Sequence, residues 1–290
     1  MGLPESRCQA SNASEEANSG AYGLRLGGVD DASALLVPTG PAWPELHVSH
    51  RLGDGAIEAE RVTADHAELR LRTGGRIDID REAGVAVFTT ARVLRTQELV
   101  HPFLAPAAAI VARWLGRESL HAGAFVGKDG AWALLGERET GKSSTLAWLA
   151  HAGCDIVCDD MLILDGGSAH FGPRSVDLRR ETAERLGAGE ELGLTGARER
   201  WRLQVGPGAT EPVPLAGCIF LEWGERVELV ELSGSERVER LFVHRGLRLP
   251  PTDPEAMLDV AARPGYELRR PRGWDGLDDA VELLLERFGA

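Results

Sequence analysis

The sequence predicts a protein of mixed α/β class, in which a small β-rich domain precedes a domain built around a phosphate-binding loop. Residues 21–96 contain short alternating runs of apolar and polar residues broken by turn residues, the pattern of an antiparallel β meander. Residues 136–144 fit G-x-x-x-x-G-K-[ST], with an apolar run before them and helical spacing after them. We therefore place a tail at 1–20, the β-rich domain at 21–116 and the loop domain at 117–290.

The net charge of the chain argues against some classes of binding partner. The 290 residues carry a formal net charge of −13, which argues against nucleic acid or an anionic membrane as the main partner. No apolar run approaches the ~20 residues of a membrane span, and no signal pattern opens the chain. The four cysteines are scattered, as is typical of a reduced, cytoplasmic protein. The polar tail is expected to be disordered.

The β-rich domain ends in a connecting helix. Residues 67–72, 77–80 and 85–90 read as strands separated by turns, and no catalytic constellation stands among them. Apolar residues then recur at helical spacing, and two prolines place the start of the continuous helix near Ala105.

The loop domain opens with a strand over 119–126, a turn, and a second strand over 131–135 that runs into the loop. Glycines let successive backbone N–H groups point at one phosphate, and the N-terminus of the following helix adds partial positive charge. Lys142 supplies a cation for the terminal phosphates, and the Ser143 hydroxyl is placed to ligate Mg²⁺. The residues expected to hold the nucleotide are Gly136, Glu139, Thr140, Gly141, Lys142, Ser143 and Ser144.

Two consecutive acidic residues, Asp159 and Asp160, end the next short strand. A carboxylate at this place can hold Mg²⁺ opposite the loop hydroxyl. A second carboxylate can accept the proton of an attacking hydroxyl group. The pair therefore favours phosphoryl transfer over nucleotide binding alone.

These segments resemble a known family. Leu120-His121-Ala122-Gly123, the 136–144 loop and Val157-Cys158-Asp159-Asp160 together look like the C-terminal domain of HPr kinase/phosphorylase. The likeness covers about residues 119–165 and extends to related kinases of lasso-peptide precursors. The wider set resembles phosphoenolpyruvate carboxykinase in its nucleotide domain. The N-terminal region does not follow the family pattern.

The resemblance implies roles for particular residues. Asp159 would be the general base for a seryl hydroxyl, with His121 beside it. Asp160 would join Ser143 at the metal. Arg179, in a short match to a downstream family signature, would be the catalytic arginine.

Local pattern predicts the remaining segments. Arg198-Glu199-Arg200-Trp201-Arg202 is a basic cluster that fits either a clamp for an anionic substrate or a solvated edge strand. Residues 189–196 are Gly- and Glu-rich and are expected to be mobile. Strands are expected at 215–223 and, as its hairpin partner, at 227–232. Helices are expected at 177–187, 236–247, 253–262 and 277–288.

The sequence thus predicts an ATP- and Mg²⁺-dependent kinase that transfers the γ-phosphoryl group to a hydroxyl, most plausibly a serine of a peptide or small protein. One alternative is the same chemistry on a small molecule such as an amino acid or sugar. Another is a nucleotide-binding or NTPase switch module without transfer. The acceptor and any association into homo-oligomers stay open at this stage.

Overall fold

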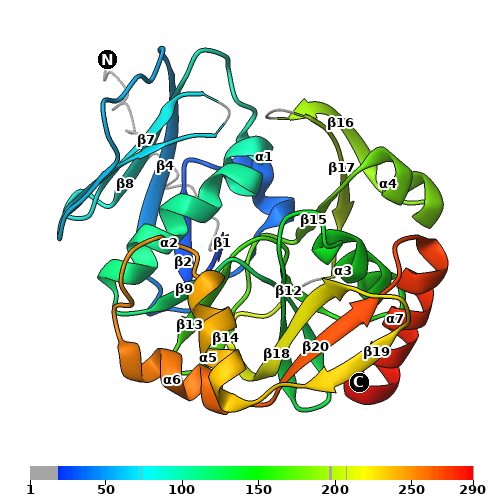
Figure 1. Ribbon diagram of the computed structural model, residues 1–290. Helices are drawn as coiled ribbons and strands as arrows, with labels where there is room; N and C mark the ends of the chain where they lie inside the picture. Colours follow the sequence, from blue (N-terminus) through cyan, green and yellow to red (C-terminus); the bar gives the residue numbers. More distant parts are fainter. Residues whose placement is uncertain (1–18, 73, 196–197, 207, 290) are drawn as a thin grey trace, which may run out of the picture.

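The computed structural model describes residues 19–72, 74–195, 198–206 and 208–289. These residues form a mixed α/β fold with three β-sheets (Figure 1). We call them the N-terminal sheet, the central sheet and the small sheet. The tail assigned to 1–20 lies outside the described residues except for Ser19 and Gly20, which belong to a strand rather than to a disordered segment.

The N-terminal sheet has the strand order β3-β1-β2-β4-β8-β7-β6-β5. Its strands are β1 (Ser19–Ala21), β2 (Leu24–Gly27), β3 (Val37–Pro38), β4 (Glu45–Leu52), β5 (Arg61–Val62), β6 (His66–Arg70), β7 (Arg76–Asp80) and β8 (Val85–Thr90). The predicted antiparallel meander is correct for β5 to β8, which pair in sequence order. It is wrong for β4, which runs parallel to both β2 and β8. Local alternation marks a strand but does not specify its neighbours.

A helical segment packs on this sheet and connects it to the first strand of the central sheet (Figure 1). It comprises α1 (Thr96–Glu98), η2 (Leu99–Phe103) and α2 (Leu104–Trp114), so the helix start expected near Ala105 is confirmed. The buried residues of α2 pack into one core with those of the N-terminal sheet. Within η2, His101 has an extended backbone (φ −149°, ψ 123°) that interrupts the helix. This break turns His101 away from the helical path.

The central sheet has the order β12-β10-β11-β18-β14-β13-β9. β14 pairs with the first residues of β18, while β20 pairs with its last six residues and also with β19. Its strands are β9 (Glu118–Leu120), β10 (Gly123–Gly127), β11 (Gly130–Leu135), β12 (Ile156–Cys158), β13 (Leu162–Asp165), β14 (Ser168–His170), β18 (Val213–Trp223), β19 (Glu228–Glu231) and β20 (Gly265–Arg270). The single strand expected over 119–126 is therefore two strands, and His121 lies between them. The hairpin expected between 215–223 and 227–232 is wrong, because β20 pairs with both β18 and β19 and separates them.

Four strands of the central sheet end at one edge. β12 and β11 are both antiparallel to β10 and so run in the same direction. β18 is parallel to β11, and β20 is parallel to β18. The segments that follow these four strands consequently emerge side by side, and ligands of open α/β sheets bind at such carboxyl ends.

The small sheet has the order β15-β17-β16 and packs beside the carboxyl edge with α4 (Figure 1). It comprises β15 (Ser175–Leu178), β16 (Glu190–Thr195) and β17 (Arg198–Gln204), while α4 spans Arg180–Leu186. The helix predicted at 177–187 therefore begins three residues late. Residues 190–195 form a strand instead of a mobile segment, and β17 is central rather than an edge strand.

The remaining helices lie where helices were predicted, although α5 ends four residues before the predicted end at 247 and α7 begins three residues before the predicted start at 277. They are α3 (Lys142–His151), α5 (Gly234–Val243), α6 (Pro254–Ala262) and α7 (Trp274–Phe288). The Ser233 side chain caps α5, and the Asp253 carboxylate caps α6 by accepting from two backbone N–H groups. α3 packs on β10 and α7, which places its N-terminus at the carboxyl edge of the central sheet.

Candidate functional site

The loop between β11 and α3 has a backbone that requires glycine at two positions. Gly136 has φ 156° and Gly141 has φ 92°, both outside the range that L side chains ordinarily adopt. A Cβ at Gly136 would lie 2.7 Å from Oγ1 of Thr140, and one at Gly141 would collide with the guanidinium of Arg270. Glu139 also has a left-handed backbone (φ 72°). The backbone geometry of the turn therefore accounts for glycine at positions 136 and 141.

Two hydrogen bonds from threonine side chains to backbone carbonyls stabilise this turn. Oγ1 of Thr140 donates a 2.8 Å hydrogen bond to the carbonyl of Glu137, and Oγ1 of Thr145 donates at 3.0 Å to that of Gly141. Gly141 precedes the first turn of α3, whose free N–H groups give this end of the helix partial positive charge.

Lys142 lies over the loop. Its Nζ donates to the carbonyl oxygens of Gly136 at 2.5 Å and Glu137 at 3.4 Å. Burial lowers the pKa of Lys142, and the carboxylates of Asp160 and Asp159 act in the opposite direction. The ammonium group is thus bound by loop carbonyls and lies within the influence of two carboxylates. A phosphate bound in the loop would compete with these carbonyls for the ammonium group.

Asp159 is buried (7% exposed) directly after β12. Burial raises its pKa to about 6, with Asp160 adding to the rise, against opposing effects of His101, the Ser143 hydroxyl and the Asp177 backbone N–H. That N–H donates to Oδ2 at 3.1 Å, whereas Oδ1 is buried without a hydrogen-bond partner. An ionised carboxylate with one free oxygen in such a place fits a cation that binds there.

Asp160 stands in a different environment from Asp159. Its side chain is 46% exposed, and its Oδ1 lies 3.3 Å from Nδ1 of His121, which is itself 43% exposed. The backbone N–H of His121 donates to the carbonyl of His244 at 2.7 Å, which fixes the segment between β9 and β10. His244 is a residue that sequence reasoning missed; burial lowers its pKa, and the charge of Lys142 adds to that effect.

A buried polar network behind Asp159 also escaped the sequence analysis. Nε2 of His101 lies 4.0 Å from Oδ2 of Asp159 and 3.6 Å from Oδ1 of Asp177. Arg200 and Arg202 reach Asp177 at 2.9 Å and 3.5 Å, and Arg202 donates to the His101 carbonyl at 2.8 Å. Arg200 and Arg202 are therefore not available to bind an anionic substrate, and the cluster as a whole is not a solvated edge strand. The sequence showed that arginines cluster here but not which residues they contact.

Other arginines gather on the exposed side of the loop. Nη2 of Arg179 donates to Oε1 of Glu139 at 2.6 Å. Arg198 lies at the surface, but partial burial of its guanidinium lowers its pKa, and the charges of Arg179 and Arg138 add to that effect. The charged loop interior thus has partners on the small sheet and at the start of α4.

The chain's own residues fit Mg²⁺ and nucleotide phosphates. Mg²⁺ prefers oxygen ligands and takes only one or two carboxylates beside phosphates and water. Ser143 with the unpartnered Oδ1 of Asp159 offers such a donor set, and Asp160 lies next to it. Within the described residues, no group of three or more His, Cys, Asp or Glu side chains forms a closed metal site. The donor set therefore matches a metal shared with a nucleotide.

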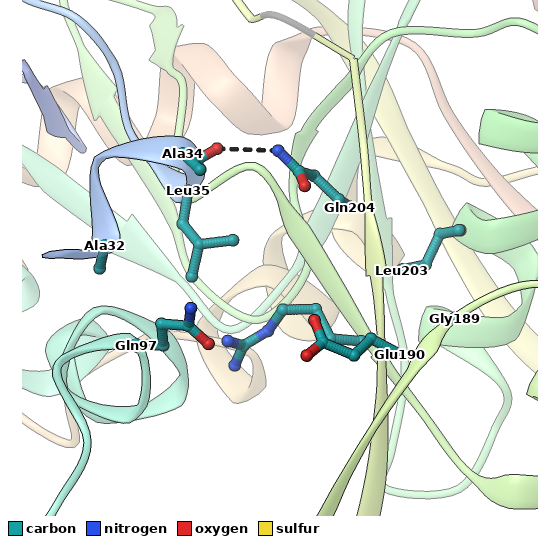
Figure 2. A pocket seen from close by; sticks show the side chains of 9 residues that line it. Ala32, Ala34, Leu35, Gln97, Gly189, Glu190, Leu203 and Gln204 are labelled. Carbon is teal, nitrogen blue, oxygen red and sulfur yellow. Dashed lines mark hydrogen bonds between the residues drawn. The ribbon is translucent and has the colours of Figure 1, made fainter.

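A cavity of about 270 Å³ lies elsewhere, between η1 (Asp30–Leu35), α1 and the small sheet. Figure 2 shows Leu35, Gln97 and Glu190 around it, and the Gln204 amide donating to the Ala34 carbonyl at 3.0 Å. Arg202 of the buried network also lines it. The 136–144 loop does not.

The structure brings most of the predicted site residues to one edge. Lys142, Ser143, Asp159, Asp160 and His121 meet where β11 and β12 end. Ser144, by contrast, lies with its hydroxyl 3.3 Å from that of Thr182 on α4.

Comparison with known proteins adds little. No family model matches the chain. No curated protein matches it either. Among solved structures, the HPr(Ser) kinase/phosphatase of Coxiella burnetii aligns with 59% of this chain and 96% of its own, at 15% identity and a TM-score of 0.27. Both measures of likeness are low, and neither the fold nor the function of this chain is inferred from them. In the part of the chain that the structure describes, no helix is long and apolar enough to cross a membrane.

Proposed function

We propose that this protein transfers the γ-phosphoryl group of ATP to a hydroxyl group, with Mg²⁺ as the cofactor. The observation that carries the proposal is the meeting of the 136–144 loop, Lys142 and the Asp159–Asp160 pair at the carboxyl edge of the central sheet. The loop supplies convergent N–H groups, Lys142 a cation, and the aspartates a metal ligand and a proton acceptor.

The geometry favours a division of labour between the two aspartates that is the reverse of the one expected from the family resemblance. Asp159 is buried, the Ser143 hydroxyl lowers its pKa, and its Oδ1 has no hydrogen-bond partner, which suits a residue that holds Mg²⁺ together with that hydroxyl. Asp160 is half exposed and lies beside His121, which suits a base that must reach a hydroxyl arriving from solvent.

In the proposed reaction, the acceptor oxygen attacks the γ-phosphorus while Asp160 removes its proton. The bond between that phosphorus and the bridging oxygen breaks, and ADP leaves with the electron pair. Lys142 and the N-terminus of α3 stabilise the negative charge on the phosphates. Mg²⁺, when bound, neutralises part of the same charge. Catalysis would then depend mainly on position and charge.

The acceptor is proposed to be a serine in a peptide or small protein. Asp160 and His121 are each more than two-fifths exposed, and the neighbouring arginines Arg179 and Arg198 are exposed too. An open, charged approach suits a bulky acceptor better than a closed small-molecule pocket does.

Single-turnover incubation with γ-labelled ATP and Mg²⁺ tests the proposal. The wild type and the Asp160→Asn variant are incubated with candidate serine peptides and, separately, with a metabolite pool. Label on a peptide, lost in the variant, supports the protein kinase; label on a metabolite supports the small-molecule kinase. Release of free phosphate alone, at the same rate in both proteins, would instead support an NTPase switch.

A further inference from the structure

We propose that Arg270 is a second fixed cation of the nucleotide site, whose buried guanidinium has the phosphate chain of the nucleotide as its counter-ion. The inference rests on the proposed function, since it takes a nucleotide as the ligand. It adds a residue on the opposite side of the loop from Asp159 and Asp160.

Arg270 reaches the loop from the last residue of β20. In the parallel register it stands opposite Trp223, the last residue of β18. Its guanidinium carbon lies 4.5 Å from the centre of the Trp223 ring. Its Nη2 donates a 3.2 Å hydrogen bond to the carbonyl of Thr140 in the loop.

The guanidinium also touches the turn that starts α3. A Cβ atom at Gly141 would collide with Nη2 of Arg270, so no side chain stands between this cation and the turn. β18 and β20 lie on one side of β11, whereas β10 and β12 lie on the other. Arg270 therefore approaches the loop from the side away from the acidic pair.

Arg270 is buried but has no acidic partner among the described residues. The residue is 4% exposed, yet no carboxylate of the described chain lies within ion-pair distance of it. Its neighbour Arg269 contacts Glu228 and Glu267. Arg202, equally buried, faces Asp177.

A buried cation whose hydrogen bonds go only to carbonyl oxygens is costly. Nη1 of Arg270 has the Pro271 carbonyl at 3.4 Å, and Nε has no hydrogen-bond partner. Burial accordingly lowers the pKa of Arg270, with no carboxylate acting against it. The charge is balanced when a polyphosphate occupies the adjacent loop, because the low-dielectric surroundings let the two charges interact at short range.

A purely mechanical role is the competing explanation, in which Arg270 only holds the Thr140 carbonyl. Lysine keeps the charge at this position, whereas glutamine keeps a donor for that carbonyl but removes the charge. Arg272 provides the matched control, since its exposed guanidinium lies 5.0 Å from the centre of the same Trp223 ring.

The test is calorimetric binding of ATP, ADP and AMP to the full chain, carrying Arg270→Met, Arg270→Lys, Arg270→Gln or Arg272→Met. Thermal unfolding without nucleotide is measured in parallel. We expect Arg270→Met and Arg270→Gln to weaken ATP and ADP roughly tenfold or more, and AMP less. Arg270→Lys should stay within about threefold of the wild type, and Arg272→Met within about twofold.

Several results would overturn the proposal. Equal losses in Arg270→Lys and Arg270→Gln, or a loss in Arg272→Met as large as in Arg270→Met, would overturn the proposal. So would unchanged ATP affinity in a folded Arg270→Met or Arg270→Gln protein. If the methionine variant does not fold, the lysine and glutamine variants decide the question alone. A wild type that binds neither ATP nor ADP would contradict the proposed function itself.

Discussion

The backbone N–H of Asp177 donates a 3.1 Å hydrogen bond to Oδ2 of Asp159. Asp177 belongs to β15 of the small sheet, and Asp159 follows β12 of the central sheet. The position of the Asp159 carboxylate thus depends on how the small sheet packs, and it is held with its other oxygen unpartnered. A buried carboxylate oxygen without a partner lowers the stability of the ligand-free protein, and a bound cation would remove that cost.

The first prediction concerns the pH dependence of stability. The pKa of Asp159 is raised from 3.8 to about 6, so its protonated form favours folding below pH 3.8 and this advantage is lost as the pH rises through 6. We expect Asp159→Asn, whose amide oxygen can still accept from Asp177, to stabilise the metal- and nucleotide-free protein above pH 6. The gain should be on the order of 2–3 kcal/mol and should vanish toward acid pH.

Urea unfolding at about pH 8 and about pH 4.5 measures this difference. Asp155→Asn is the control, because Asp155 is an exposed carboxylate just before β12 and should have no effect. A destabilised Asp159→Asn protein at the higher pH would show that the buried charge is compensated.

The second prediction separates the roles of the two aspartates. Asp160→Asn should lower kcat by roughly 10²- to 10⁴-fold and leave the Mg²⁺ requirement nearly unchanged, because it removes a proton acceptor. Asp159→Asn and Ser143→Ala should both raise the Mg²⁺ concentration needed for half-maximal rate. Steady-state rates at several Mg²⁺ concentrations provide the measurement, and the reverse pattern would restore the assignment suggested by the family resemblance.

The third prediction concerns the buried network. Asp177→Asn leaves Arg200 and Arg202 facing a neutral amide, and Arg202 is almost fully buried. We expect a loss of roughly 3–5 kcal/mol in the free energy of unfolding. Glu199→Gln breaks an exposed pair with Arg180 on the same sheet and should cost less than about 1 kcal/mol. Similar losses in both variants, measured by chemical denaturation, would contradict the importance of burial.

Local sequence was enough to predict the loop, the helix after it and the acidic pair. Gly141 and Lys142 belong to a short motif whose function depends on consecutive residues, so it can be recognised without the rest of the fold. The start of α6 is local in the same way, because Asp253 caps it and Pro254 is its first residue.

Pairings between distant segments were beyond such reasoning. β20, with Glu267, Arg269 and Arg270 among its six residues, has too many charges to read as a strand of the central sheet. His101 and Asp177 approach Asp159 only because a break in η2 and the packing of β15 bring them there. Neither residue carries a local signal of that contact.

The most direct measurement is equilibrium binding of ATP with Mg²⁺ by the wild type, Lys142→Met and Lys128→Met. The chain contains two lysines, and Lys128 is exposed in the turn between β10 and β11, which makes it a matched control. We predict saturable binding by the wild type and Lys128→Met, and a loss of roughly tenfold or more in Lys142→Met. Equal affinity in all three proteins, or no binding by the folded wild type, would contradict a nucleotide site at the 136–144 loop.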